Sequence, residues 1–529
     1  MIRNLINEAD YSLIKKTHNY YSIFQTIVFI FFIIITIKLF LIVSKSSESV
    51  TFKTKEIVYP TLFDANNNVL AQTLITHKIQ VSNFENLNNN YKNILIKDIN
   101  ILSPKIAKQI NDLTSNFFFI DRSPSKKKIL ETLYLGNPEI KLDRFYKRNY
   151  PFNAYTKNLI GKMDIDNVGQ SLIEKQMNSF DQSLRLSINI DLQKEASDVL
   201  DKELIKYDAN YGMFILVDLL KEELLVNTYN ANRNYLDLKF DDSVMPSISN
   251  RYEFGSVFKP ITVYSALNNN VLNLDEYFDV TEPLKRHTGN GYITDLFPIK
   301  EKIQTKDILK RSSNIGAALI NRKIDCSFQF KKDLFNLGLL NSVSIMENIK
   351  TIEPSQPLHY TRKGNYCDNL AFGYALSVSP INLINAYSRM ITGKGDFEVN
   401  ITKQRNFKDL NLDTVSSNIN RLLFYANESD HMLYRSCLVA GKTGTADDKS
   451  IIKDNEDMSP KVYNNVTYMS YFPYNKPRYL ALTFMNHPKK TKFKYLTAGN
   501  TVKNSFYNIM AQILFSLEVS SCDKDLSTI

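Results

Sequence analysis

A serine and a lysine three residues apart could form an acyl-transfer centre in this chain. Ser256 and Lys259 fit the pattern S-x-x-K within the segment Gly255–Pro260. At the start of a helix, positions i and i+3 share one face, so the lysine amine would reach the serine hydroxyl. A serine hydroxyl attacks poorly until a base removes its proton, and a lysine can be that base only if burial or another cation lowers its pKa. The pattern therefore predicts a nucleophile, its base and, in the N–H groups of the helix start, donors for an oxyanion.

The S-x-x-K pattern alone is a weak signal, because the chain contains other copies of it. One copy precedes an apolar segment, two lie in a lysine-rich run and one lies in a polar loop: Ser12–Lys15, Ser123–Lys126, Ser125–Lys128 and Ser450–Lys453. A second pattern, S-x-N, occurs at Ser312–Asn314 and again at Ser416–Asn418. These copies show that neither pattern is specific by itself.

The segment Lys442–Thr445 reads K-T-G-T, which occurs once. It follows the apolar run Leu438–Ala440, so we expect it on a strand, with Lys442 and Gly444 facing one way and Thr443 and Thr445 the other. Glycine would leave room for a substrate backbone to lie against the strand. The three patterns follow one another in the order S-x-x-K, S-x-N, K-T-G, a set known from serine acyl-transfer enzymes.

The elements that must position these motifs come from the two ends of the segment 183–515. Two strand-like runs joined by a charged turn predict a hairpin, and further strand candidates lie near the C-terminus, with helical patterns between them. This arrangement predicts an α+β fold in which a mainly antiparallel sheet of early and late strands is flanked by helices. The expected segments are strands Leu186–Ile190, Phe214–Val217, Leu224–Val226, Val439–Ala446 and Tyr479–Met485, and helix Asp191–Tyr207.

An apolar segment near the N-terminus predicts a membrane anchor. Thr17–Ile37 carries no formal charge and, at about 1.5 Å per residue, is long enough to cross a bilayer core of about 30 Å. A cleavable signal peptide is the alternative, but the run is longer than such peptides use and lacks an Ala-x-Ala site. Arg3, Lys15 and Lys16 precede the span and favour a cytoplasmic N-terminus. The domains that we predict are a cytoplasmic tail (1–16), an anchor (17–43), an accessory domain of short strands and helices (50–175), a catalytic domain (183–515) and a C-terminal tail (516–529).

Composition excludes several classes of protein. The chain has 529 residues, 43% of them hydrophobic and 23% charged, which is ordinary for folded domains. Its net charge of +10 comes without a zinc finger, basic helix or RNA-binding signature, so we expect no nucleic-acid partner. The six histidines form no metal-binding pattern, so we predict neither a metal nor a cofactor. The four cysteines cannot form a disulfide framework, although Cys326 and Cys367 could pair in an oxidising compartment.

Together, the motifs resemble those of class B penicillin-binding proteins, most closely the division-specific FtsI-type D,D-transpeptidases. The resemblance extends from the membrane segment to about residue 512. It rests on the three motif segments and on accessory elements similar to those of the family: Arg251–Pro260, Lys310–Ala317, Ala440–Ala446, Phe372–Tyr374 with Ser379–Pro380, Leu62–Ala71, Arg148–Pro151 and Gly169–Glu174. It implies a pedestal-like, elongated accessory domain beside the transpeptidase domain.

The chain departs from the family pattern at three positions. Asn68 stands where the family usually has Gly, and we expect the turn to survive because Asn tolerates positive φ. Ala375 stands where a second Gly is common, and Glu222 replaces a hairpin Gly. None of the three lies in a chemical motif.

The resemblance implies a role for each motif residue. Ser256 would attack a D-Ala-D-Ala stem peptide and Lys259 would be its base, while Ser312 passes a proton to the leaving amine. Asn314 would hold the substrate or Lys259, and Lys442 would lower the pKa of Lys259 and attract the substrate carboxylate. The residues expected to bind that carboxylate or the oxyanion are Thr443, Thr445 and the backbone N–H groups of Ser256 and Thr445, with Gly444 beside them.

The implied partners are peptidoglycan stem peptides, on a lipid-linked precursor or nascent glycan, and β-lactams as covalent inhibitors. A septal glycosyltransferase of the SEDS family and other division membrane proteins are further implied partners. The expected location is the cytoplasmic (inner) membrane at the division septum, with the catalytic domain periplasmic. The alternatives are an elongation-type transpeptidase, a D,D-carboxypeptidase, a β-lactamase, and a non-catalytic scaffold of the division machinery.

Overall fold

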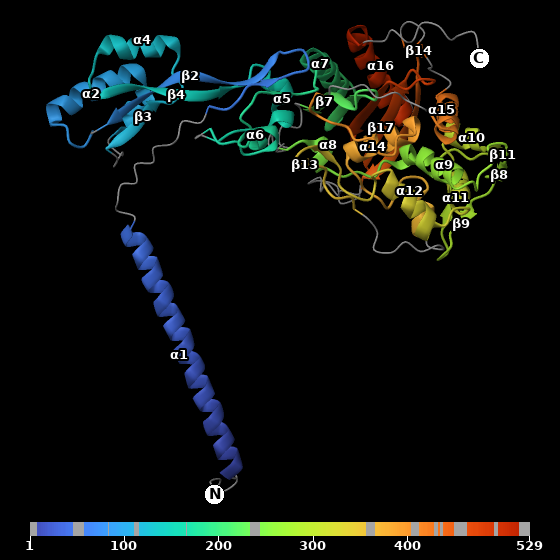
Figure 1. Cartoon of the computed structure of the whole chain (residues 1–529), viewed down its shortest axis with the longest axis horizontal. Helices are drawn as coiled ribbons and strands as arrows, with labels where there is room; N and C mark the ends of the chain where they lie inside the picture. The colour runs from blue at the N-terminus through green and yellow to red at the C-terminus, as the bar shows by residue number, and fades with distance from the viewer. Residues whose placement is uncertain are drawn as a thin grey trace. The chain divides into compact units, whose positions relative to one another are not determined.

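The computed structural model describes most of the chain, and its helices and strands are labelled in Figure 1. The chain divides into two units, residues 1–57 and 58–529. The expected polar loop after Asp447 and most of the predicted C-terminal tail lie outside the described residues, which are 8–45, 58–82, 84–110, 116–164, 167–232, 244–355, 365–403, 412–427, 432–433, 437–448, 463–490 and 496–517.

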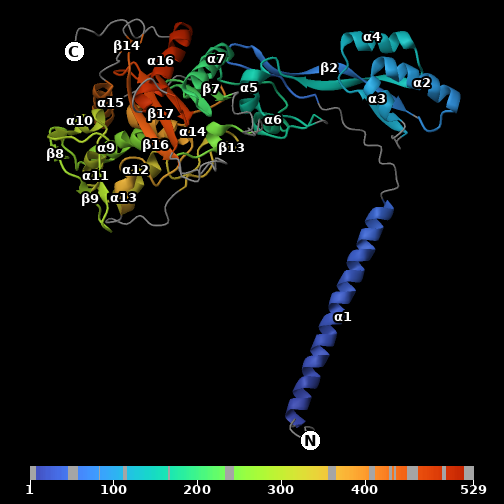
Figure 2. The ribbon, with the colours of Figure 1, turned by 180° about the vertical axis from the view of Figure 1, so that it is seen from behind.

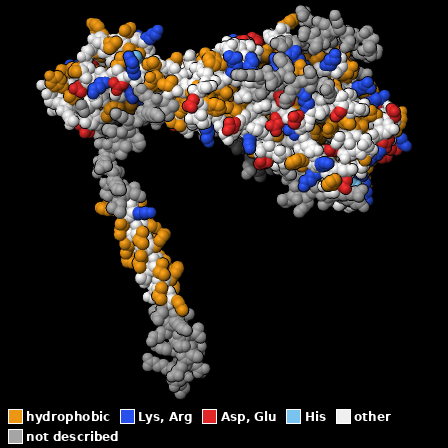
Figure 3. Space-filling view, in the orientation of Figure 1, with side chains coloured by type: hydrophobic (Ala, Val, Ile, Leu, Met, Phe, Trp, Pro, Cys, Tyr) orange, Lys and Arg blue, Asp and Glu red, His pale blue; other side chains and the backbone are white. Residues whose placement is uncertain are grey.

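The first unit contains the long helix α1 (Glu8–Lys45). In the part of the chain that the structure describes, it is the one helix long and apolar enough to cross a membrane, over Tyr20–Phe40. Its apolar side chains are exposed, and Figure 3 shows them covering this stretch of the helix. An apolar surface of this kind has no favourable contact with water, so the helix is consistent with the predicted anchor.

The N-terminal part of the second unit is built around one long strand pair. β2 (Val69–Ser82) pairs antiparallel with β4 (Ile140–Asn149) from Gln72 to Val81, so the expectation of short strands is wrong here. A continuous ten-residue partner is what allows so long a strand to form. The neighbouring elements are β1 (Leu62–Phe63), β3 (Phe117–Asp121), α2 (Asn89–Leu102), α3 (Pro104–Gln109), α4 (Lys126–Leu135), α5 (Asn153–Ile160) and α6 (Leu172–Met177).

Two of the accessory elements that resemble the family meet in a buried ion pair. Arg148 Nε donates to Glu174 Oε1 at 2.9 Å, and both side chains are almost fully buried. A third element forms the turn after β1, where Asp64 accepts from the backbone N–H of Asn66 and Asn68. The left-handed residue of this turn is Asn67 (φ 72°), so the turn survives but not through a positive φ at Asn68.

The central sheet of the second unit joins the early hairpin to the late strands, as predicted. Its order is β16-β17-β18-β6-β7 and every pairing is antiparallel. The strand β17 was not predicted from the sequence. The five strands are β6 (Tyr211–Asp218), β7 (Glu223–Ala231), β16 (Ala440–Asp448), β17 (Tyr463–Phe472) and β18 (Tyr479–Asn486).

Helices cover both faces of this sheet (Figures 1 and 2). One apolar core lies between the sheet and two helices, α7 (Ile190–Tyr207) and α16 (Val502–Ile513). A second apolar core contains the sheet and three other helices, α9 (Lys259–Asn268), α14 (Pro380–Thr392) and α15 (Thr414–Ala426). The remaining elements are β5 (Leu184–Arg185), α8 (Pro246–Ser249), β8 (Tyr277–Asp279), β9 (Leu284–Lys285), β10 (Tyr292–Ile293), β11 (Lys302–Gln304), α10 (Thr305–Lys310), α11 (Asn314–Asn321), α12 (Lys331–Asn336), β12 (Ser344–Met346), β13 (Ile349–Lys350), α13 (Asn365–Leu370), β14 (Met432–Leu433) and β15 (Cys437–Leu438).

The predicted strand Leu186–Ile190 is wrong. The strand is Leu184–Arg185, and Leu186 forms only an isolated bridge with Thr402. The reason is the side chain of Asn189, which accepts from the N–H groups of Asp191 and Leu192 and so starts α7 at Ile190.

Two of the departures from the family pattern adopt the backbone conformation that glycine favours. Glu222 has φ 56° and Ala375 has φ 70°, both left-handed. The backbone N–H of Ala375 donates to Glu253 Oε1 at 2.6 Å, which holds this conformation in place. A Cβ atom in this region is sterically unfavourable by about 1–2 kcal/mol.

We therefore predict that Ala375→Gly raises the free energy of unfolding by about 0.5–1 kcal/mol, because the relief of strain exceeds the added chain entropy of glycine. Urea unfolding followed by tyrosine fluorescence measures the change. Ala386→Gly inside α14 is the control and should lower stability by about 1 kcal/mol. A loss of stability in both variants would contradict the prediction.

Candidate active site

The S-x-x-K motif lies at a helix start, as predicted. Ser256 is in a short 3₁₀ helix (Gly255–Phe258) that runs directly into α9 at Lys259. Lys259 Nζ lies 2.8 Å from Ser256 Oγ, and its side chain is fully buried, whereas Ser256 is partly exposed. A ligand could therefore reach the hydroxyl, while the amine lies beneath it, away from water.

Two glycines allow the K-T-G-T strand to pack directly on the nucleophile segment. A Cβ atom on Gly444 would lie 2.4 Å from the Phe254 carbonyl oxygen, and one on Gly255 would lie 2.5 Å from that of Thr445. The space left by Gly444 is therefore filled by the 3₁₀ helix of Ser256, so the expectation that it leaves room for a substrate backbone is wrong. The missing side chain lets β16, which carries Lys442, pack directly against the segment that carries Ser256.

Ser312 is the point at which the three motifs meet. Lys259 Nζ donates to its carbonyl oxygen at 2.5 Å and lies 3.1 Å from its Oγ. Lys442 Nζ donates to the same Oγ at 3.2 Å. Ser312 has a left-handed backbone (φ 58°), which turns the chain into α11. One hydroxyl thus contacts both lysine side chains.

Burial and a neighbouring positive charge lower the pKa of both lysines. Burial lowers the pKa of Lys259 well below its ordinary value, the charge of Lys442 lowers it further, and Asp295 acts in the opposite direction. Burial, followed by the charge of Lys503, lowers the pKa of Lys442 to about 7. An amine without its proton is available at Lys259 for general-base chemistry.

Of the two roles expected for Asn314, the contact with Lys259 does not form in the described part of the structure, and holding the substrate stays a prediction. Its side chain donates to the Thr294 carbonyl oxygen at 3.0 Å, and none of the described contacts joins it to Lys259. Asp295 instead organises this end of α11, because it accepts from the backbone N–H groups of Asn314 and Ile315 and from Ser313 Oγ. Sequence reasoning missed Asp295, which lies far upstream in a loop with no motif of its own.

The remaining residues of the K-T-G-T segment lie where the strand pattern predicts. Lys442 and Gly444 are buried against the nucleophile side, while Thr443 and Thr445 are partly exposed. Thr445 Oγ1 accepts from the backbone N–H of Ala498 at 3.2 Å.

Within the described ranges, no group of three or more His, Cys, Asp or Glu side chains could hold a metal ion.

Comparison with known proteins gives this arrangement a family. The penicillin binding protein transpeptidase domain matches residues 212–511, more than half of the chain. The chain belongs to the penicillin-binding protein transpeptidase family, class B and FtsI-type. The predicted α+β fold class is confirmed by the same comparisons.

The relatives of this family member are distant in sequence. The peptidoglycan D,D-transpeptidase FtsI of Buchnera aphidicola subsp. Baizongia pistaciae is 22% identical over 423 residues, 70% of each chain. That of subsp. Schizaphis graminum is 25% identical over 363 residues, 60% of each chain.

Two solved structures share the fold at low identity. Penicillin binding protein 3 of Mycobacterium tuberculosis, complexed with aztreonam, has a TM-score of 0.61 at 14% identity, covering 87% of this chain and 96% of its own. A peptidoglycan synthetase from Bifidobacterium adolescentis has a TM-score of 0.62 at 16% identity, covering 89% and 97%.

The pKa of Lys259 predicts how one substitution changes the pH dependence of acylation. Lys442→Met removes a positive charge, so the pKa of Lys259 should rise and the amine should lose its proton only at higher pH. The acidic limb of acylation rate against pH should therefore move to higher pH, as measured with a fluorescent penicillin. A limb that stays in place or moves to lower pH would contradict this cause.

The glycine contact gives a second prediction. Gly444→Ala places a methyl group against the Phe254 carbonyl and Val257, so the strand and the nucleophile segment must separate. We expect acylation to slow by about 100-fold, the size of effect that a misplacement of about 1 Å produces. Gly499→Ala is the control, because its Cβ would meet only Thr497 Oγ1, at 3.7 Å. Equal rates in the two variants would show that close packing at Gly444 is unnecessary.

Proposed function

We propose that this protein is a peptidoglycan D,D-transpeptidase that works through a serine acyl-enzyme on Ser256. The observation that carries the proposal is the convergence of Ser256, Lys259, Ser312 and Lys442 within hydrogen-bond distance. The family match and the FtsI relatives support the reaction class, and the geometry supplies a nucleophile next to a buried amine.

The first half of the reaction forms the acyl-enzyme. Neutral Lys259 takes the proton of Ser256, and the alkoxide attacks the carbonyl between the two terminal D-Ala residues of a stem peptide. The oxyanion is stabilised by the backbone N–H groups of Ser256 and Thr445, each such donor being worth about 3–4 kcal/mol. The protonated Lys259 then returns this proton through the Ser312 hydroxyl, which it contacts, to the departing D-Ala amine, and Lys259 is neutral again.

The second half transfers the acyl group to an amine of a neighbouring stem peptide. The amine attacks the ester carbonyl, loses its proton to the same base, and releases Ser256 as a hydroxyl. Lys442, Thr443 and Thr445 attract and bind the terminal carboxylate of the donor, and Asn314 contributes a polar group at the rim. A β-lactam has the same acyl and carboxylate groups and acylates Ser256 in place of the donor.

The cell biology that we propose follows from the anchor and from the disulfide. α1 holds the protein in the cytoplasmic membrane with its N-terminus in the cytoplasm, and the catalytic domain (183–515), beyond the accessory domain (50–175), is periplasmic. The disulfide between Cys326 and Cys367 supports this placement, since disulfides persist in oxidising compartments. The FtsI relatives support a role at the division septum, beside a SEDS-family glycosyltransferase and other division membrane proteins.

Intact-mass analysis after exposure to penicillin tests the proposal. We predict one penicilloyl adduct on the native protein, mapped to the peptide that contains Ser256, and none on Ser256→Ala. Ser123→Ala is the matched control, because it removes the serine of another S-x-x-K copy on an exposed segment and should keep the adduct. An adduct that persists in Ser256→Ala, or a native protein that never reacts, would reject the serine mechanism.

A further inference from the structure

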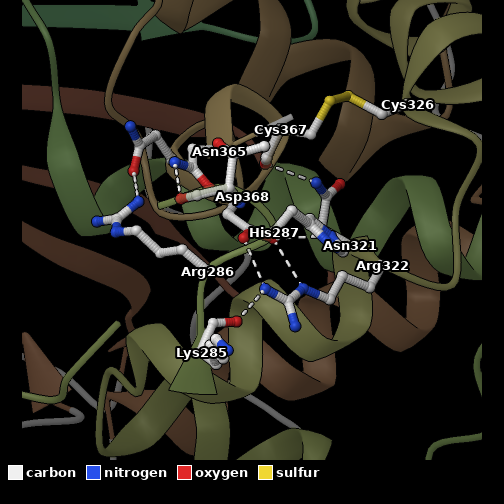
Figure 4. A network of polar contacts seen from close by, with 11 residues as sticks. Lys285, Arg286, His287, Asn321, Arg322, Cys326, Asn365, Cys367 and Asp368 are labelled. Carbon is white, nitrogen blue, oxygen red and sulfur yellow. Dashed lines mark hydrogen bonds and ion pairs between the residues drawn. A yellow bond between two sulfur atoms is a disulfide. The ribbon is translucent and has the colours of Figure 1, made fainter. Parts of the chain in front are cut away.

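A disulfide and an ion pair join the end of α11 to α13 (Figure 4). Cys326, at the start of the π-helix that follows α11, is bonded to Cys367 in α13, and both are buried. The sequence left this pairing open, and the structure forms it. The bond connects chain positions that are 41 residues apart.

The ion pair lies next to the disulfide. Arg322 donates to both carboxylate oxygens of Asp368, from Nε at 2.9 Å and from Nη2 at 2.7 Å, and the Asp368 side chain is 1% exposed. Asn321 Nδ2 donates to the Cys367 carbonyl oxygen at 2.7 Å. Such a bidentate pair fixes orientation as well as distance, because both groups are planar.

A third segment closes the network around the ion pair (Figure 4). Arg322 Nη2 also donates to the carbonyl oxygen of Lys285, and Arg286 donates to Asn369 Oδ1 at 2.8 Å. The end of α11 and the body of α13 are thus bound to adjacent residues, the last residue of β9 and the one that follows it. This doubles the connection between the two helices.

Each helix leads directly to one part of the active site. α11 is eight residues long, about 12 Å, and begins at Asn314, two residues after Ser312. The segment after α13 contacts the nucleophile side, because Ala371 O accepts from Thr262 Oγ1 of α9 and Gly373 O accepts from Gly255 N. A Cβ on Gly373 would lie 1.9 Å from the Gly255 carbonyl oxygen, so this contact is close.

We propose that Arg322, Asp368 and the Cys326–Cys367 disulfide are positioning residues for the acylation step. They hold α11 at its far end, as Asp295 does at its near end, and so fix the Ser312 hydroxyl relative to Ser256 and Lys259. The inference rests on the proposed function, since it assigns these groups an effect on Ser256 acylation. None of them contacts the reacting atoms.

The test separates noncovalent binding of a fluorescent penicillin from the maximal rate of acylation. Two full-length variants are compared with the native protein: Asp368→Asn, and the double variant Cys326→Ser with Cys367→Ser. The double variant tests the cross-link even if the buried charge of Asp368 is needed for folding. We expect the maximal acylation rate to fall at least about tenfold, with the dissociation constant within about twofold of the native value. Intact-mass analysis gives the fraction of protein that is finally labelled. This fraction measures how much of the protein is folded, and the acylation rate is divided by it.

Lys323→Gln is the matched control. Lys323 follows Arg322 in the chain and forms its own ion pair with Glu276, but none of its hydrogen bonds and ion pairs within the described residues reaches α13. Its acylation rate should equal that of the native protein. If Asp368→Asn and the double cysteine variant both acylate at the native rate per folded molecule, even with a lower melting temperature, the inference is overturned. The proposed function would still stand. A native protein that is never acylated would instead reject the proposed function, and this inference with it.

Discussion

Two buried lysine side chains share one serine hydroxyl, and the chemistry of the site depends on this arrangement. Lys259 and Lys442 both contact Ser312 Oγ, and neither amine is surrounded by water. Burial disfavours the charged form of each amine, and two like charges that are close together disfavour it further. In the proposed mechanism, this lowered pKa lets Lys259 act as the base under conditions in which an exposed lysine would remain protonated. Without that shift, Ser256 would be an ordinary hydroxyl.

The fold serves this arrangement by bringing three distant segments into contact. β16 is an edge strand of the sheet and packs on the 3₁₀ helix of Ser256 through Gly444. α11 presents Ser312 from the other side, with Asp295 at its start. Because burying two amines is unfavourable, the surrounding packing and hydrogen bonds must hold them in place.

The sequence predicted the chemical centre better than its surroundings. Motif order and strand alternation singled out Ser256, Lys259, Ser312 and Lys442, which the structure brings together, because their types and spacing are visible along the chain. The direction of the Asn314 side chain and the role of Asp295 depend on a loop whose path no local pattern encodes. The segment that packs against Gly444 is likewise set by tertiary contact. The sequence indicated that a glycine is needed there, but the space is used by the nucleophile segment and not by a substrate backbone.

A direct measurement of the Lys259 pKa tests the central claim. The full-length protein, labelled with ¹³C at lysine Cε, would be titrated by NMR, and the Lys259 signal assigned by its loss in Lys259→Arg. The account predicts that this signal titrates well below the exposed lysines, whose ordinary pKa is about 10.4. A Lys259 signal that titrates together with the exposed lysines would contradict the account, because the amine would then be charged and unable to accept the proton of Ser256.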